Sequence, residues 1–481
     1  MSPSTMPLTA RHWWIASVAS LGQLVGTAVA TIAGVIIPML LICDQNGMSS
    51  VLQGLIGAAD LIGIMVGSLF FGKLSDRYGY LLFFRLCPVI IVVFSLLAVV
   101  FPHVAILVVS LFMVGFGIGG EYSLDSDYTS ELMPDRWKVF MLGMVKTGAA
   151  FGNIIAAGLC FLFVMAWKDA AKWPDLMLII AGIGALMFAS RIYFFESPKW
   201  LLDHGHAEKA NIALHRFLGN DVNYPADMAG ADAAQAKAEA ARSKMSTGNF
   251  IRSYFDRVVF SGIPWACEGL GVYGIGVFIP ILVMTLGIEH ESASTPQILH
   301  VAQSVKTTLW ISCIILPGFL TGIFLTCRRI RIVGLQASCF WACGGALLLL
   351  LFSYMLKWPV WISLISFMAF ELFLNIGPHL VTYLLPPRIY PVAVRGQGTG
   401  IAAAIGKAGA TAGVFLVPWL LEVGGGVLVL GVSAAIMGAG ALVTSIYGRR
   451  VDRNQQFSPP APAATQDALT PPTVKQSESK S

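Results

Sequence analysis

Among the carboxylic side chains inside long apolar segments of this 481-residue chain, four are candidates for chemistry: Asp60, Glu121, Glu268 and Glu371. An ionised carboxylate is costly in apolar surroundings, so such a group finds a cationic partner or takes up a proton. Each of the four is therefore a candidate for binding and releasing a proton. Glu121 ranks first, because glycines precede it and Tyr122 follows it. The alternative for Glu121 is a structural carboxylate that pairs with a basic side chain.

Two lysines, Lys146 and Lys407, also lie inside apolar segments. A long lysine side chain can reach out of hydrocarbon toward water, which is the structural explanation for both residues. If they instead face a common cavity, their two ammonium groups would attract an anion. These alternatives stay open at the level of the sequence.

Further polar and aromatic side chains recur at helical spacing. Glu371, Asn375 and His379 lie four residues apart and form one polar stripe, which is expected to face a cavity. Trp265 and Tyr273 lie with Glu268 in a segment interrupted by glycines and prolines, typical of helices that line a binding site. The alternative is that these glycines only allow close helix packing. The predicted substrate-binding candidates are Tyr122, Gln23, Trp265, Tyr273, Asn375, His379, Lys146 and Lys407.

The composition of the chain excludes several classes of protein. Hydrophobic residues make up 56% and charged residues 12%, whereas an average soluble protein carries about 25% charged residues. A soluble enzyme cannot be built with so little polar surface. The basic residues lie in short loops between apolar runs, so the net charge of +5 does not indicate a nucleic-acid partner. The eight cysteines are scattered, and we expect no metal site and no cofactor.

Twelve apolar segments are long enough to span a bilayer, and each must be helical because hydrocarbon leaves no other partner for backbone groups. With both termini cytoplasmic, only Lys168, Lys172, Lys306 and Lys357 lie on the outer side, and the excess of basic residues falls inside. The spans are expected at about 14–42, 51–72, 80–101, 104–130, 138–166, 174–195, 257–287, 302–327, 333–356, 359–385, 397–421 and 425–447.

The two halves of the chain resemble each other, which predicts an all-α membrane protein of two pseudo-symmetric six-helix bundles. Gly34-Val-Ile-Ile-Pro38 matches Gly276-Val-Phe-Ile-Pro280, and Lys146-Thr-Gly-Ala matches Lys407-Ala-Gly-Ala in the same order. Paired bundles of this kind enclose a central substrate path. The expected units are the bundles 1–195 and 257–447, a cytoplasmic linker at 196–256 with a surface helix near 226–245, and a disordered tail at 448–481.

Three motifs resemble those of a known family. Phe71-Gly-Lys-Leu-Ser-Asp-Arg-Tyr-Gly79 resembles the loop signature of the major facilitator superfamily, and Glu196-Ser-Pro-Lys-Trp-Leu201 resembles a motif of its sugar-porter branch. Gly117-Ile-Gly-Gly-Glu-Tyr122 resembles a string of its phosphate:proton symporters. Gly269 and Arg388 stand where these branches carry acidic residues, so the resemblance does not identify the substrate. It does imply a conformational latch at the cytoplasmic helix ends, formed by Asp76, Arg77 and Glu131.

These observations predict a secondary active transporter of the bacterial inner membrane rather than an enzyme. We expect a monomer in the lipid bilayer that moves a small polar solute together with protons, the solute being an organic anion, a sugar or a related metabolite. In this hypothesis Glu121 carries the coupling proton, followed in order by Glu371, Asp60 and Glu268. An exporter of the same fold stays open, as do a non-transporting membrane sensor and a membrane-embedded enzyme.

Overall fold

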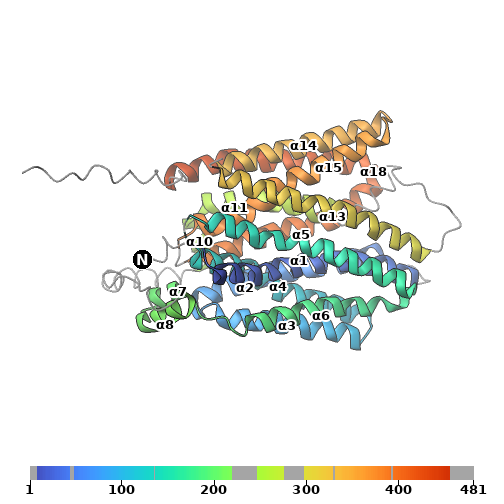
Figure 1. The fold of residues 1–481 in the computed structure, drawn as a ribbon. Helices are drawn as coiled ribbons and strands as arrows, with labels where there is room; N and C mark the ends of the chain where they lie inside the picture. Colours follow the sequence, from blue (N-terminus) through green and yellow to red (C-terminus); the bar gives the residue numbers. More distant parts are fainter. Residues whose placement is uncertain are drawn as a thin grey trace, which may run out of the picture.

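The structure of the protein, a computed structural model, describes residues 8–43, 48–134, 136–218, 246–275, 297–328, 331–391 and 394–455. These residues form helices joined by short connections (Figure 1). The helices of the first half are α1 (Ala10–Cys43), α2 (Ser50–Tyr78), α3 (Leu81–Val100), α4 (Val104–Leu132), α5 (Lys138–Trp167), η2 (Ala170–Leu176) and α6 (Met177–Arg191). The linker carries α7 (Pro198–Asp203), α8 (Ala207–Leu218) and α10 (Thr247–Ser253). The helices of the second half are α11 (Phe255–Gly269), η3 (Leu270–Ile275), α13 (Gln297–Cys327), α14 (Ile332–Met355), α15 (Val360–Ile376), α16 (Pro378–Leu384), α17 (Pro386–Ile389) and α18 (Arg395–Gln455).

The predicted membrane fold is confirmed. Eleven helical stretches of the described residues are long and apolar enough to cross a bilayer, and α11 with η3 forms the described part of the remaining span. Large apolar side chains such as Leu162, Leu186 and Trp310 are exposed on the outer surface. Such a surface suits hydrocarbon rather than water, because water would penalise it. The protein is therefore an integral multi-pass membrane protein with twelve spanning segments.

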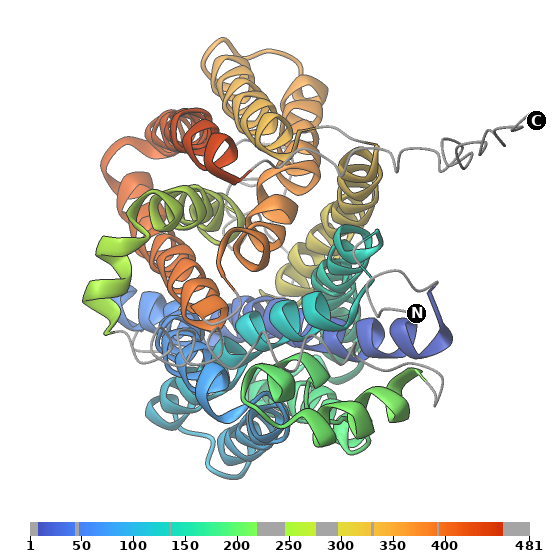
Figure 2. The same ribbon diagram turned by 90° about the vertical axis from the view of Figure 1, so that its left-hand side faces the viewer.

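The helices form two bundles that lie against each other, one from each half of the chain. Figure 2 shows the first half as one group and the second half as another. The two bundles touch chiefly where α2 meets the first part of α18 and where α5 meets α13. In Figure 1 the start of α1, the end of α18 and the linker helices α7, α8 and α10 lie at the same end of the molecule. That end is called the linker end below.

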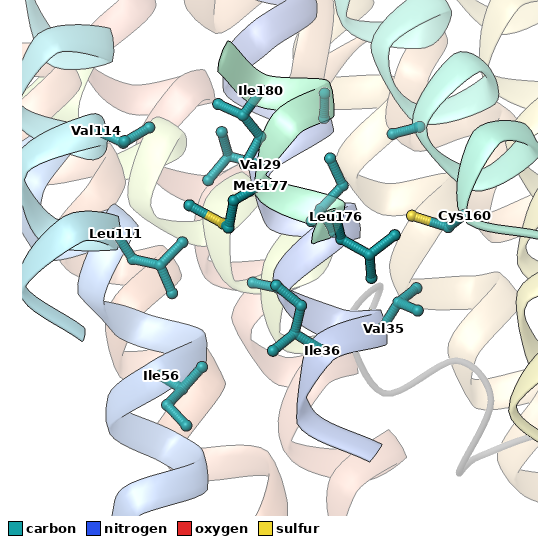
Figure 3. Close-up of a cluster of buried hydrophobic side chains, with 14 of the residues drawn as sticks. Val29, Val35, Ile36, Ile56, Leu111, Val114, Cys160, Leu176, Met177 and Ile180 are labelled. Atoms are coloured by element: carbon teal, nitrogen blue, oxygen red, sulfur yellow. The ribbon is translucent and has the colours of Figure 1, made fainter. Parts of the chain in front are cut away.

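Buried apolar side chains fill both bundles, and the clusters of the first half extend across the boundary into the second. In the first half, side chains of α1, α2, α4, α5 and α6 meet in one cluster, of which Figure 3 labels Val29, Leu111 and Met177. Helices α2 and α4 approach closely at glycines: a Cβ on Gly63 or Gly119 would collide with the backbone of the other helix. In a bilayer the hydrophobic effect does not drive helices together. Small residues instead let the helix backbones approach, and van der Waals contacts hold them.

At the linker end, α2 and α18 meet at the glycine seam, which is formed by Gly72, Gly396 and Gly400. A Cβ on Gly72 would meet the carbonyl oxygen of Gly396 at 2.5 Å and the Cα of Gly400 at 3.2 Å. A Cβ on Gly400 would collide with the carbonyl oxygen of Ser68. The backbones of the two halves therefore touch directly at this seam.

Three helices depart from regular geometry. The seventh span changes from α-helix to the π-helix η3 at Leu270, and the tenth breaks at Gly377 between α15 and α16. Helix α18 contains the eleventh and twelfth spans, with a kink at Gly425, whose φ is 62°. It continues to Gln455, so the first residues of the segment expected to be disordered are helical; the later tail, residues 276–287 and the expected surface helix near 226–245 lie outside the described residues.

Candidate functional site

A cavity lies between the two bundles, in the part of the molecule away from the linker end. It has a volume of about 120 Å³ and is lined by the second half of α1, by α5, η3 and the first half of α13, and by the break between α15 and α16. Its polar lining side chains are Thr27, Thr31, Asn153, Tyr273, Ser304, Thr308, Ser312, Glu371, Asn375 and His379. The three residues of the predicted stripe, Glu371, Asn375 and His379, therefore lie on the wall of one cavity.

The two lysines meet at the centre of the molecule, between this cavity and the linker end. Lys146 and Lys407 are 1% and 3% exposed, and both line one compact cluster, called the lysine compartment below. The Lys407 ammonium donates a hydrogen bond of 2.6 Å to the Tyr273 hydroxyl. The Lys146 ammonium donates one of 3.3 Å to the Gln23 side chain. The two ammonium groups thus lie in the interior instead of reaching toward water.

Aromatic rings surround the two ammonium groups. The Tyr122 ring lies under both, with its centroid 4.7 Å from Lys407 Nζ and 5.5 Å from Lys146 Nζ. The Tyr273 ring lies 4.0 Å from Lys407 Nζ, and Trp265 packs beside Tyr122. The negative face of an aromatic ring stabilises a cation, although less than a carboxylate does. The lysine compartment can therefore hold positive charge while leaving the ammonium groups able to attract an anion.

One carboxylate, Glu268, lines the lysine compartment together with both lysines. Its Oε1 lies 3.6 Å from Nε2 of His379, and Nδ1 of that histidine lies 2.9 Å from Oδ1 of Asn375. His379 follows the break at Gly377, where a Cβ would collide with Cys339 of α14. The break therefore positions the histidine between the cavity and the lysine compartment.

Asp60 is buried on α2, where that helix meets the second half. It is 1% exposed, and neither carboxylate oxygen has a hydrogen-bond partner in the described part of the chain. Lys407 of α18 acts on it electrostatically. Asp60 thus belongs to the surroundings of the lysine compartment.

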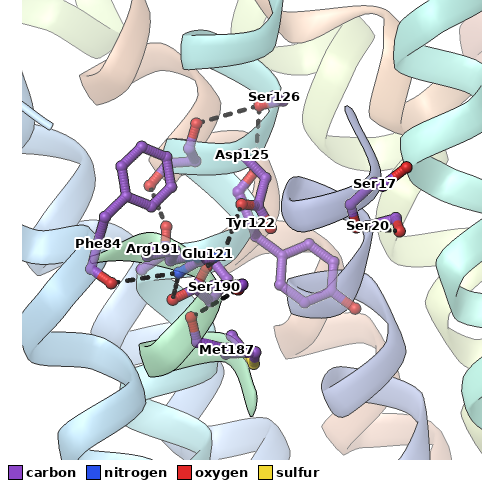
Figure 4. Close-up of polar contacts among 12 residues, drawn as sticks. Ser17, Ser20, Phe84, Glu121, Tyr122, Asp125, Ser126, Met187, Ser190 and Arg191 are labelled. Atoms are coloured by element: carbon purple, nitrogen blue, oxygen red, sulfur yellow. Dashed lines mark hydrogen bonds and ion pairs between the residues drawn. The ribbon is translucent and has the colours of Figure 1, made fainter. Parts of the chain in front are cut away.

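Glu121, the first-ranked proton candidate, lies elsewhere. Figure 4 shows Glu121 and Asp125 of α4 turned toward Arg191 of α6, inside the first bundle. Arg191 donates hydrogen bonds of 2.8 Å to Glu121 and 3.1 Å to Asp125, and none of the three side chains is exposed. This geometry matches the alternative for Glu121, a structural carboxylate paired with a basic side chain, and the proton role of Glu121 stays a prediction. The charged hydrogen bond to the guanidinium stabilises the buried carboxylate there, and Glu121 does not line the cavity.

At the linker end, charged groups of the first half meet the start of α18. Asp76 accepts hydrogen bonds from the backbone N–H groups of Gly396 and Gln397, at 3.1 and 2.9 Å. A helix N-terminus binds anions because its first N–H groups lack helical partners. Asp76 of the predicted latch therefore joins the first half to the start of α18, whereas Arg77 is exposed and lies 5.1 Å above the Tyr78 ring.

A second set of contacts reinforces the latch. Arg395 of α18 lies 3.5 Å from Glu131 and donates to the Ser130 hydroxyl at 3.4 Å. Asp127 accepts a hydrogen bond of 3.2 Å from the Thr399 hydroxyl. The first half thus supplies carboxylates, and the second half supplies a cation and a helix N-terminus, which explains how the latch forms without an acidic residue in the second half.

The motif that begins at Glu196 packs against the loop between α2 and α3 at the linker end. Glu196 accepts hydrogen bonds from the N–H groups of Tyr80 and Leu81, and Trp200 donates its indole N–H to the carbonyl of Asp76. Burial raises the pKa of the Glu196 carboxyl, and the N–H groups oppose that rise. Gly79 has a φ of 87°, and a Cβ there would collide with Glu196. The motif thus fixes the loop that carries Asp76.

Three contributors were not foreseen from the sequence: Arg191, Asp127 and Arg395. Arg191 is the last residue of an apolar span, a position where a basic residue is ordinary. The available signal was on α4, where two carboxylates four residues apart require a buried cation. Asp127 and Arg395 have no sequence signal beyond their charge, because their pairing depends on how the two halves meet.

Comparison with known proteins agrees with this architecture. The structure of the proton:xylose symporter XylE, bound to 6-bromo-6-deoxy-D-glucose, aligns with a TM-score of 0.75 at 19% identity, covering 92% of this chain and 96% of that one. The inner membrane metabolite transport protein YgcS of Escherichia coli is 25% identical over 446 residues, which is 92% of each chain. A repressible high-affinity phosphate permease of Neurospora crassa is 25% identical over 389 residues, 73% of this chain and 67% of that one.

The fold, the central cavity and the relatives define a secondary transporter of the major facilitator superfamily, not an enzyme. The family model for the sugar (and other) transporter family matches residues 40–447. The chain belongs to that family.

Proposed function

We propose that the protein is a proton-coupled symporter of an organic anion in the bacterial inner membrane, with both termini cytoplasmic and working as a monomer. The observation that carries the proposal is the meeting of Lys146 and Lys407 in one compartment with Glu268. These lysines occupy matched positions in the two halves, so an anion between them would contact both bundles at once. Binding to both halves is what alternating access requires of a substrate.

Charge balance links the anion to a proton. The two ammonium groups and the Glu268 carboxylate together carry one net positive charge. When a monoanion binds the lysines, it replaces Glu268 as their counter-ion, and Glu268 then takes up a proton more readily. The same charge is restored, so anion and proton travel together. Asp60, near Lys407, and Glu371, on the cavity wall, are the next candidates for the proton.

The orientation follows from the positive-inside rule, which assigns the linker end to the cytoplasm. In that orientation the latch of Asp76, Glu131 and Arg395 closes the cytoplasmic side, and the cavity lies toward the outside. Transport then requires the latch contacts to break when the loaded carrier opens inward.

The test begins with a thermal-shift screen of the purified protein against sugars, phosphate, carboxylates and aromatic acids, because a bound ligand stabilises the folded state. The ligand found is then used with Glu268→Gln, which mimics the protonated carboxyl. This variant is expected to keep counterflow in proteoliposomes but to lose accumulation driven by an imposed pH step. Glu422→Gln, at an exposed position, is the matched control and should keep both. Full pH-driven accumulation by Glu268→Gln would move the proton to Asp60 or Glu371.

A further inference from the structure

The lysine compartment and the larger cavity are two parts of one site. Tyr273 and His379 line both of them, and they form the boundary between the two. The lysine compartment itself leaves no free volume, so a negative group that reaches Lys407 takes the place of the Tyr273 hydroxyl. The rest of the ligand then lies in the larger cavity. The side chains of that cavity consequently describe the body of the substrate.

The cavity wall on α13 presents three hydroxyl groups, two of which already donate their hydrogens to the helix backbone. Ser304, Thr308 and Ser312 lie four residues apart and therefore share one face of the helix. Thr308 donates its hydrogen to the carbonyl of Ser304 at 3.0 Å, and Ser312 donates to the carbonyl of Thr308 at 2.8 Å. Each of these oxygens keeps lone pairs for a further bond. This wall therefore accepts hydrogen bonds and matches a ligand that donates them.

The opposite wall repeats this chemistry on the first half. Thr31 of α1 donates its hydroxyl hydrogen to the Asn153 side chain of α5 at 2.9 Å, and a second contact joins it to the carbonyl of Thr27 at 3.1 Å. The Thr31 oxygen is thus also left as an acceptor. Hydrogen-bonding groups from both halves therefore face the space between them, where a ligand bearing several hydroxyl groups can bond to each wall.

Glu371 limits the charge of the ligand body. Its side chain lines the cavity and is 5% exposed in the folded protein. A carboxylate there accepts hydrogen bonds from hydroxyl groups but repels a second negative group on the ligand. A dicarboxylate is disfavoured for this reason, whereas one negative group at the lysines and a neutral hydroxylated body fit both compartments.

We infer that the substrate is a hydroxylated monocarboxylate of the sugar-acid type, with its carboxylate at Lys146 and Lys407 and its hydroxyl groups against α13, α1 and α5. The inference rests on the proposed function and specifies its substrate class. A neutral sugar would bring no negative charge to replace Glu268 as the counter-ion of the ammonium groups. A fatty acid would leave the polar walls unpaired, and a site built for hydroxyl groups discriminates strongly against ligands that lack them.

The test compares five probes in thermal shift and in competition for uptake: gluconate, glucose, hexanoate, glucarate and inorganic phosphate. Gluconate is expected to bind at least about tenfold more tightly than each of the others, a difference of about 1.4 kcal/mol. Equal or tighter binding of any other probe overturns the inference. The absence of stabilisation by all five also overturns it.

Two sets of variants separate the compartments. Lys407→Gln should weaken gluconate binding about tenfold or more, while Lys306→Gln, at an exposed position of α13, should not. Ser312→Ala combined with Thr308→Val should weaken gluconate but not hexanoate. Thr307→Val, beside Thr308 but outside the cavity lining, is the control. Equal losses for gluconate and hexanoate in the α13 variant would contradict the assigned hydroxyl wall.

The substrate class and the proton coupling fail in different ways. Gluconate uptake that does not depend on an imposed pH step would refute the coupling and leave the substrate class standing. Uptake of phosphate or glucose driven by a pH step would refute the substrate class and leave the coupling standing.

Discussion

Two clusters of buried charge in this protein have similar chemistry but opposite architecture. Glu121, Asp125 and Arg191 lie within one bundle, on α4 and α6, and each carboxylate contacts the guanidinium directly. Lys146, Lys407 and Glu268 are drawn from both bundles, and the two ammonium groups bond to neutral groups, an amide oxygen and a phenol hydroxyl. In the first cluster each carboxylate forms an ion pair with the one guanidinium, whereas the second has cations without a carboxylate in direct contact.

The difference suggests how a carrier can separate stability from transport. Partners within one rigid bundle keep their distances when the bundles rotate, so their charges can be paired permanently. Partners from different bundles change their distances during the cycle, and charges that exchange partners there can couple one ligand to another. The latch belongs to the second kind, because Asp76 and Glu131 meet α18 across the boundary.

The largest effect is expected from Arg191→Gln, which leaves two buried carboxylates without their cation. Removing one partner of a buried ion pair costs about 3–5 kcal/mol of stability. Thermal unfolding of the purified variant measures the loss. Arg85→Gln, an exposed arginine of the same bundle, is the control and should change stability by less than about 0.5 kcal/mol.

A triple variant sharpens this comparison. Replacing Arg191, Glu121 and Asp125 together by neutral residues of similar size should recover most of the lost stability, because no unpaired charge then remains. If Arg191→Gln is as stable as Arg85→Gln, the cluster does not have the structural role assigned to it.

An intermediate effect is expected from Asp76→Asn. Hydrogen bonds to a charged group contribute about 1.5–3 kcal/mol, and losing that charge weakens the closed linker end. Spin labels at the exposed positions Lys73 and Arg449 should show the two halves moving apart there, and uptake should slow. Arg77→Ala should change neither the distance between the spin labels nor the uptake rate, because Arg77 is exposed and lies over the ring of its neighbour Tyr78. Normal uptake by Asp76→Asn would exclude this role.

The smallest effect on transport is expected from Glu121→Gln. Asp125 remains as the counter-ion of Arg191, so the loss of stability should be smaller than that caused by Arg191→Gln. Because Glu121 has no place in the cavity lining, accumulation driven by a pH step should persist. If the variant loses that accumulation but keeps counterflow, Glu121 carries the coupling proton. The cluster of Glu121, Asp125 and Arg191 then has a transport role as well as a structural one.

The membrane architecture is predictable from the sequence because it depends on local properties. Span length, hydropathy and the matched motifs of the two halves define the spanning segments and their grouping without any knowledge of contacts. The exception is the boundary after residue 447: α18 runs on to Gln455, since Arg449, Arg450 and Arg453 are compatible with a helix although they are too polar for a span.

The site is predictable only where two independent patterns agree. Lys146 and Lys407 are matched between the halves, and Tyr122, Trp265 and Tyr273 accompany them, so their convergence follows from the duplication. Glu121 and Tyr122 are sequence neighbours that point in different directions, because successive helical residues are about 100° apart. The sequence does not say which of the two faces the lysine compartment; in the structure Tyr122 lines it, and Glu121 turns toward Arg191 on α6.

The glycine seam between α2 and α18 has a consequence for the speed of the cycle. Interfaces built from interlocking side chains must change rotamers before they can slide, and a densely packed interface resists such movement. At Gly72, Gly396 and Gly400 backbone lies directly on backbone, and few side chains have to be unlocked. The activation barrier for opening this end then depends mainly on the polar contacts of Asp76 and Arg395. Turnover could in that case be tuned by single polar substitutions, without rebuilding the surface over which the two halves move.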